Sequence, residues 1–139
     1  MSSPVILLPL TADESKDFLP PPVQAKLNSL PVRQVPVPLP LPDPSSWKSI
    51  LQQHRPEILL CAWGCPALPE DLPVGQPGQL RYVAYLAGSV KKLVPRKLIE
   101  NGLQVTNWGN AISRTISECG LLLILTAMRR AGYWNVAMH

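Results

Sequence analysis

Short apolar runs alternate with amphipathic segments through the first 110 residues of the chain. The runs are bounded by proline, glycine or asparagine, and this pattern predicts buried strands. They read "VILLPL" (5–10), "EILLCAWG" (57–64), "LRYVAYLAG" (80–88) and "LQVTNWG" (103–109).

The segments between these runs carry apolar residues at helical spacing, which predicts helices over 20–30, 43–56 and 94–101. Asp43 or Ser45 is expected to cap the second helix, and Pro56 to end it. A longer helix is predicted from Ala111 to Ala131. Its apolar stripe consists of Ile112, Ile116, Cys119, Leu123 and Ile124.

Proline stands at every second position from Pro36 to Pro42. Because proline cannot donate to a strand ladder, we expect at most Val32–Val35 to pair, and only near a sheet edge. The rest is expected to be an extended, polyproline-like loop that crosses its own domain. A proline-rich docking segment over Pro36–Pro44 is the alternative.

Strands that alternate with helices predict an α/β fold: a doubly wound parallel sheet of about five strands, with helices on both faces. The flavodoxin-like strand order fits this number of strands. We expect residues 1–110 to form this domain, and residues 111–139 to form a long C-terminal helix and tail. Ligands of such sheets sit beyond the carboxyl ends of the strands. The short loops leaving those ends begin at Trp63-Gly64, at Ala87-Gly88-Ser89 and at Asn107.

Composition narrows the function classes. The formal net charge is +4 and the cations are scattered, so nucleic-acid binding is not expected. The strongest apolar run, "GLLLILTAM" at 120–128, is too short for a membrane span, and no signal peptide is evident. A cytoplasmic location is therefore expected. The cysteines Cys61, Cys65 and Cys119 lack the spacing of a metal site and are predicted to be buried, reduced thiols.

The turn at Ala87-Gly88-Ser89 is the clearest candidate for chemistry. Glycine at a strand end lets the backbone approach a ligand closely, and successive N–H groups there can converge on one anion. A small carboxylate is a natural guest, with Lys91 adding positive potential. The competing interpretation is that Gly88 only permits tight packing between a strand and a helix.

From Leu80 to Tyr133, the chain resembles the substrate domain of the D-isomer-specific 2-hydroxyacid dehydrogenase family. Four blocks carry the resemblance, in the order and spacing of that family. They are "LRYVAYLAGSVKKLV", "LIENGLQVTN", "TISEC" and "LLLILTAMRR".

The resemblance implies NAD(H) as cofactor and a small 2-oxo or 2-hydroxy acid as substrate. It places the substrate carboxylate on the backbone of Ala87, Gly88 and Ser89, with the nicotinamide approaching Ala87. Trp63 and Gly64 would wall the substrate pocket. The pair Thr115 and Ile116 would line the cofactor cleft.

No G-x-G-x-x-G can be assembled from the glycines of this chain. In the family, the nucleotide-binding domain and the catalytic Arg, Glu and His come after the long helix. We therefore expect no catalytic residue in this chain and no dehydrogenase turnover by it alone. Glu118 is interpreted as a partner of free N–H groups near a helix N-terminus, rather than as the family's glutamate.

Two further partners fit this interpretation: a separate nucleotide-binding chain, or a second copy that associates through helix 111–131. The alternative function is a stand-alone carboxylate-binding or protein-interaction module without catalysis.

Overall fold

The computed structural model describes residues 3–43 and 45–137. It divides into two compact units, residues 1–107 and residues 108–139. Each unit is described separately below.

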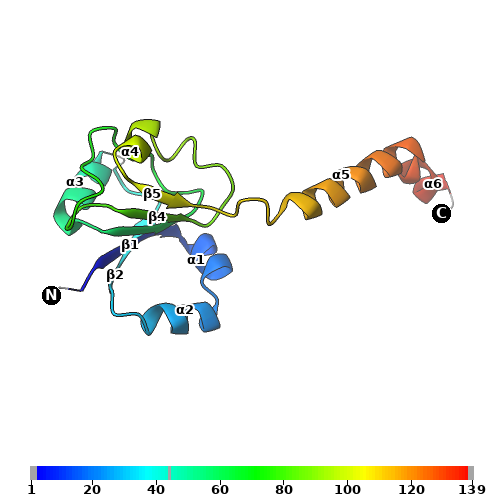
Figure 1. Cartoon of the computed structure of the whole chain (residues 1–139). Coiled ribbons are helices and arrows are strands. Elements are labelled where there is room, and N and C mark those ends of the chain that lie inside the picture. Colours follow the sequence, from blue (N-terminus) through cyan, green and yellow to red (C-terminus); the bar gives the residue numbers. More distant parts are fainter. Residues whose placement is uncertain (1–2, 44, 138–139) are drawn as a thin grey trace. The chain divides into compact units, whose positions relative to one another are not determined.

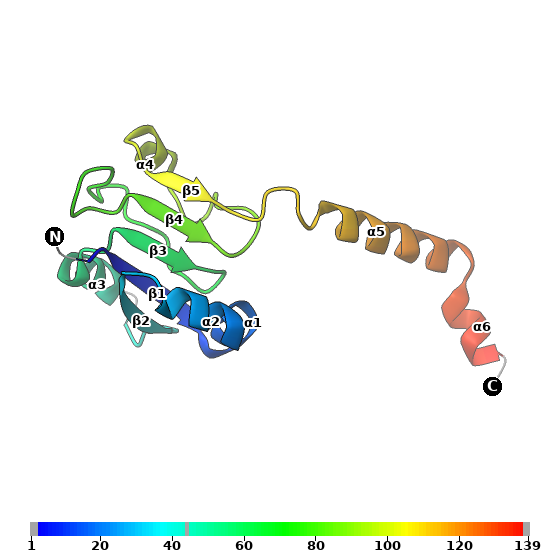
Figure 2. The ribbon, with the colours of Figure 1, turned by 60° about the horizontal axis from the view of Figure 1, so that its bottom comes forward.

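The first unit contains a sheet of five strands, and every pairing in it is parallel. The strand order is β2-β1-β3-β4-β5 (Figures 1 and 2). This is the flavodoxin-like order, so the predicted fold class is confirmed. The strands are β1 (Val5–Thr11), β2 (Arg33–Leu39), β3 (Ile58–Cys61), β4 (Tyr82–Tyr85) and β5 (Gln104–Thr106).

Helices lie on both faces of the sheet: α1 and α2 on one face, α3 and α4 on the other (Figure 1). Successive strand residues point to opposite faces, so each strand supplies both cores. Leu7 packs with Trp47 and Leu98 under α3 and α4, whereas Ile6 packs with Leu27 of α2. The helices are α1 (Ala12–Phe18), α2 (Pro21–Asn28), α3 (Ser46–His54) and α4 (Arg96–Glu100).

The proline-rich strand β2 corrects the expectation that pairing ends at Val35. It pairs with β1 along its whole length, from Val5 opposite Arg33 to Thr11 opposite Leu39. The N–H of Arg33 donates to the carbonyl of Pro4, which directly precedes β1. The N–H groups of the odd-numbered residues of β2 therefore point toward β1. The nitrogen atoms of Pro36 and Pro38, which carry no hydrogen, therefore point to the open edge of the sheet. No neighbouring strand needs a hydrogen bond there.

Two helices of the structure were not predicted from the sequence. The sequence interpretation missed α1, which begins with a capping box formed by Thr11 and Glu14. The helix expected over 111–131 is present as α5 (Ser113–Met128), and a second helix that the sequence interpretation missed, α6 (Ala131–Ala137), follows it. The backbone between them turns at Arg130, whose φ of 48° lies in the left-handed region and ends helical geometry.

Candidate functional site

The carboxyl ends of β1, β3 and β4 form one edge of the sheet. β1 lies between β2 and β3, so the chain leaves β1 and β3 in opposite directions, and the point between them is the topological switch point. Ligands of doubly wound sheets gather at this point, and the loops after Thr11, Cys61 and Tyr85 reach it first.

Glu14 already occupies the switch point. Its side chain accepts the N–H of Thr11 at 2.9 Å through Oε2 and the N–H of Gly64 at 2.7 Å through Oε1. Its own N–H donates to Thr11 Oγ1 at 3.2 Å. Glu14 is only 6% exposed, so a protein carboxylate is buried where an anionic ligand of this fold would otherwise sit. The sequence signal that could have revealed it is Thr-x-x-Glu after a strand, at residues 11–14.

Gly64 is held by this arrangement. A Cβ atom at this position would lie 2.9 Å from Thr11 Cγ2 and 3.1 Å from Glu14 Oε2, so the glycine permits the close approach of two loops. Its N–H is bound to Glu14, and Gly64 does not line the cavity described next. The structure therefore gives Gly64 a role in joining β1 to β3.

A cavity of about 350 Å³ opens beside the switch point, above β3 and β4. Two residues predicted from the sequence, Trp63 and Ser89, line it together. The Trp63 ring is largely exposed and packs against Phe18 at a centroid distance of 5.2 Å. Five further residues complete the lining, and the sequence interpretation assigned none of them to a site: Ala62, Cys65, Tyr85, Lys92 and Leu93.

The turn after β4 leaves its backbone donors open. The N–H groups of Ala87, Gly88 and Ser89 donate to no other residue in the described part of the chain, whereas the carbonyl of Gly88 accepts from Asn107 Nδ2. Only Ser89 of the three lines the cavity, because Ala87 is fully buried and Gly88 is not part of the lining. A Cβ at Gly88 would meet no atom within 4 Å, and its φ is not in the left-handed region. Packing among the described residues therefore does not require glycine at position 88.

The side chains of Cys65 and Tyr85, which line the cavity, are uncharged at neutral pH. The pKa of the Cys65 thiol is raised, first by its hydrogen bond with Cys61 and then by burial. Burial, followed by the two thiols and Glu14, raises the pKa of Tyr85. Lys92 is the only basic residue in the lining, while its neighbour Lys91 lies outside it. The positive charge expected from Lys91 therefore comes from Lys92.

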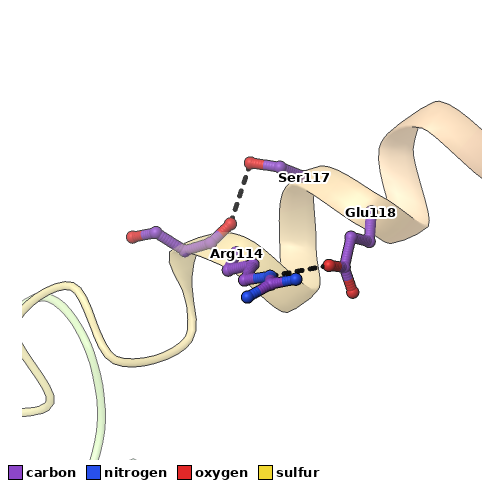
Figure 3. Close-up of polar contacts among 4 residues, drawn as sticks. Arg114, Ser117 and Glu118 are labelled. Atoms are coloured by element: carbon purple, nitrogen blue, oxygen red, sulfur yellow. Dashed lines mark hydrogen bonds and ion pairs between the residues drawn. The ribbon is translucent and has the colours of Figure 1, made fainter.

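Thr115 and Ile116 belong to the second unit, in the first turn of α5. Figure 3 shows that the polar contacts around them are internal to this helix. Arg114 Nε contacts Glu118 Oε1 at 2.9 Å, and Ser117 Oγ donates to the Ser113 carbonyl at 2.8 Å. The interpretation of Glu118 as a partner of free N–H groups is therefore wrong, because its carboxylate pairs with Arg114 four residues earlier.

The second unit keeps its apolar side chains exposed. Within 108–137, none of the residues of α5 is buried. Cys119 is exposed as well, which contradicts the expected burial of all three thiols. Self-association through helix 111–131 stays a prediction.

A larger cavity, of about 660 Å³, lies near the amino ends of β3 and β4. Its lining includes Arg55, Pro56 and Leu80, but none of the residues predicted to bind substrate or cofactor. The parallel strands place it at the opposite edge from the turn at 87–89. It is therefore a separate feature of the first unit.

The loop after β1 does not fit the pyrophosphate of NAD. A dinucleotide needs backbone amides and a helix N-terminus free to hold its pyrophosphate. After β1, the amide of Thr11 is bound by Glu14, which would also repel a pyrophosphate. Within the described ranges, no group of three His, Cys, Asp or Glu side chains could hold a metal ion. Nor does any helix there combine the length and apolar character needed to cross a membrane.

Comparison with known proteins found no matching family model, no match among curated proteins and no match among solved structures.

Proposed function

We propose that the first unit binds a small carboxylate in the cavity above β3 and β4. The observation that carries this proposal is a pair of donors that line one small cavity: Ser89, whose backbone N–H donates to no other described residue, and the ammonium group of Lys92. The resemblance to 2-hydroxyacid dehydrogenases supports a 2-oxo or 2-hydroxy acid as the ligand.

The size and chemistry of the cavity suit such a ligand. Ligand pockets range from about 300 to 1,000 Å³, and this one, at about 350 Å³, lies at the small end. Lys92 can donate up to three hydrogen bonds to a carboxylate, and its charge strengthens them. The Ser89 hydroxyl in the same lining adds a further donor.

Gly88 supports the same interpretation. Packing and φ do not account for a glycine there, and the missing side chain would let a ligand approach the backbone closely. The neighbouring position between β1 and β3 is a weaker candidate, because Glu14 already binds the amides of Thr11 and Gly64.

The proposed activity is binding, with no reaction step. No residue of this chain is assigned as catalytic, and no step through NAD(H) is derived, because the described residues offer no cradle for it. A dehydrogenase activity would require a nucleotide-binding domain to supply the cofactor and the reacting groups, as the resemblance implies.

A titration of the ¹⁵N-labelled chain with 2-oxobutyrate tests the proposal. We expect the largest amide shifts at Trp63, Gly88, Ser89 and Lys92. Lys92→Gln should weaken binding about threefold to tenfold, the range of one partly exposed charged contact. Lys91→Gln is the matched control and should change the affinity less than about twofold. The proposal fails if saturating acid shifts no amide near the cavity, or only those around Leu80.

A further inference from the structure

Tyr85 lines the cavity with a polar hydroxyl group that the binding proposal does not yet use. The residue is only 9% exposed, and it lines the cavity at the end of β4. Its hydroxyl has no hydrogen-bond partner among the described residues. Yet no fully buried side-chain nitrogen or oxygen in that part of the chain lacks a partner. The hydroxyl oxygen therefore keeps contact with solvent, and the cavity is where this contact lies.

Tyr82 shows what the same strand does with a tyrosine that is satisfied internally. It lies three positions earlier on β4 and therefore points to the other face of the sheet. Its hydroxyl is 2.6 Å from Thr106 Oγ1 on the neighbouring strand. A mostly buried tyrosine usually finds such a partner. The Tyr85 hydroxyl has no such partner among the described residues. It lines a cavity in which a bound ligand could supply one.

The chemistry around Tyr85 defines the kind of partner it needs. Burial and the adjacent thiols raise its pKa, so the hydroxyl is protonated and able to donate throughout the neutral range. The Cys65 thiol, which also lines the cavity, directs its own weak hydrogen bond to the Pro66 carbonyl at 3.5 Å. A ligand in the cavity that offers an oxygen acceptor could therefore take this hydrogen bond in place of solvent.

We propose that Tyr85 is a specificity-determining residue that donates a hydrogen bond to a second oxygen of the bound acid. The cavity is small and Lys92 lines it too, so this oxygen lies close to the carboxylate. The site then selects short acids that carry a neutral oxygen acceptor next to the carboxylate, and it disfavours the corresponding plain alkanoic acids. This inference rests on the proposed carboxylate binding.

The test compares 2-oxobutyrate with butyrate, which differ by the one oxygen in question. The wild-type chain should bind 2-oxobutyrate about fivefold to tenfold more tightly, the value of one hydrogen bond to a neutral acceptor. In Tyr85→Phe the two affinities should agree within about twofold, with that for butyrate unchanged. The matched control is Tyr82→Phe on the same strand, which should keep the wild-type preference.

The outcomes separate the two proposals. Equal affinity of the wild-type chain for both acids overturns the role of Tyr85 and leaves carboxylate binding intact. Failure of both acids to bind overturns carboxylate binding, and this inference with it. A preference that survives in Tyr85→Phe assigns the selection to another group and also overturns the inference. If Tyr85→Phe does not fold, the Tyr85 ring of the wild-type chain is followed by NMR instead: its resonances should shift with 2-oxobutyrate and much less with butyrate, and equal shifts would overturn the inference.

Discussion

Replacing Glu14 by alanine should destabilise the first unit more than any change to its exposed ion pairs. The carboxylate holds two loops together, because it accepts one N–H from Thr11 and one from Gly64. Both are hydrogen bonds to a charged acceptor, and such bonds contribute about 1.5–3 kcal/mol each. Removing a buried charge returns part of its desolvation cost, and the exposed Gly64 N–H can bind water. We therefore expect a loss of about 2–3 kcal/mol in the free energy of unfolding.

Glu14→Gln sharpens the test because it keeps the size of the side chain. Glutamine retains one acceptor oxygen, but its NH₂ group must then face one of the two N–H donors. One hydrogen bond is replaced by a contact between two donors, so the variant should lose about 1–2 kcal/mol. A purely steric role for Glu14 would instead leave this variant close to wild type.

The assay is urea unfolding followed by tryptophan fluorescence, to which the buried Trp47 of the first unit contributes. Glu14→Ala should lower the urea midpoint by about 1–2 M with an unchanged slope. The control is Glu100→Ala, which removes an exposed contact of 2.8 Å with Arg96 and should cost less than about 0.5 kcal/mol. Equal midpoints for Glu14→Ala and Glu100→Ala would refute the reasoning.

Three further predictions use matched positions in the first unit. Gly64→Ala should cost about 1–3 kcal/mol in thermal unfolding, because its Cβ would meet the side chains of Thr11 and Glu14. Gly88→Ala adds a Cβ in open space and should leave the melting temperature unchanged. The reverse order would contradict the described packing. Val35→Pro should cost about 3 kcal/mol because its N–H faces β1, and Gln34→Pro much less, so equal losses in urea unfolding would contradict the register of β2. The raised pKa of Tyr85 means that the unfolded chain loses this proton first; stability should fall as the pH rises above about 10, and less steeply in Tyr85→Phe, so parallel pH profiles would count against burial of the ring.

Local patterns carried most of the fold prediction. The apolar runs around Leu7, Leu59 and Val83 are buried strands, because a parallel strand covered on both faces must be apolar throughout. The alternation of these runs with helical segments was enough to predict the parallel sheet and its flavodoxin-like order. The full pairing of the proline-rich strand β2 could not be predicted, because a sequence does not show which side of a strand makes the ladder hydrogen bonds.

The candidate site was only partly predictable. Strand-end loops were the right places to look, and Trp63 and Ser89 do share a cavity. The sequence predicts that Gly64 lines the same pocket. In the structure Gly64 lies outside the lining, and its N–H is bound to Glu14, fifty positions away in the chain. Such a contact leaves no local trace beyond a capping box, because it depends on how two loops meet in space.

The sequence alone determined which apolar runs are buried strands and which turn is rich in small residues, although it did not reveal α1 or the full length of β2; it also shows that no G-x-G-x-x-G motif is present. These properties follow from side-chain size, polarity and spacing, which act over a few neighbouring residues. The tertiary structure alone decided which groups remain unsatisfied. It places Glu14 at the switch point and Lys92, rather than Lys91, in the lining of the cavity. It also leaves the Tyr85 hydroxyl without a partner among the described residues. Such hydrogen bonds and burial depend on how segments that are distant in the sequence pack together.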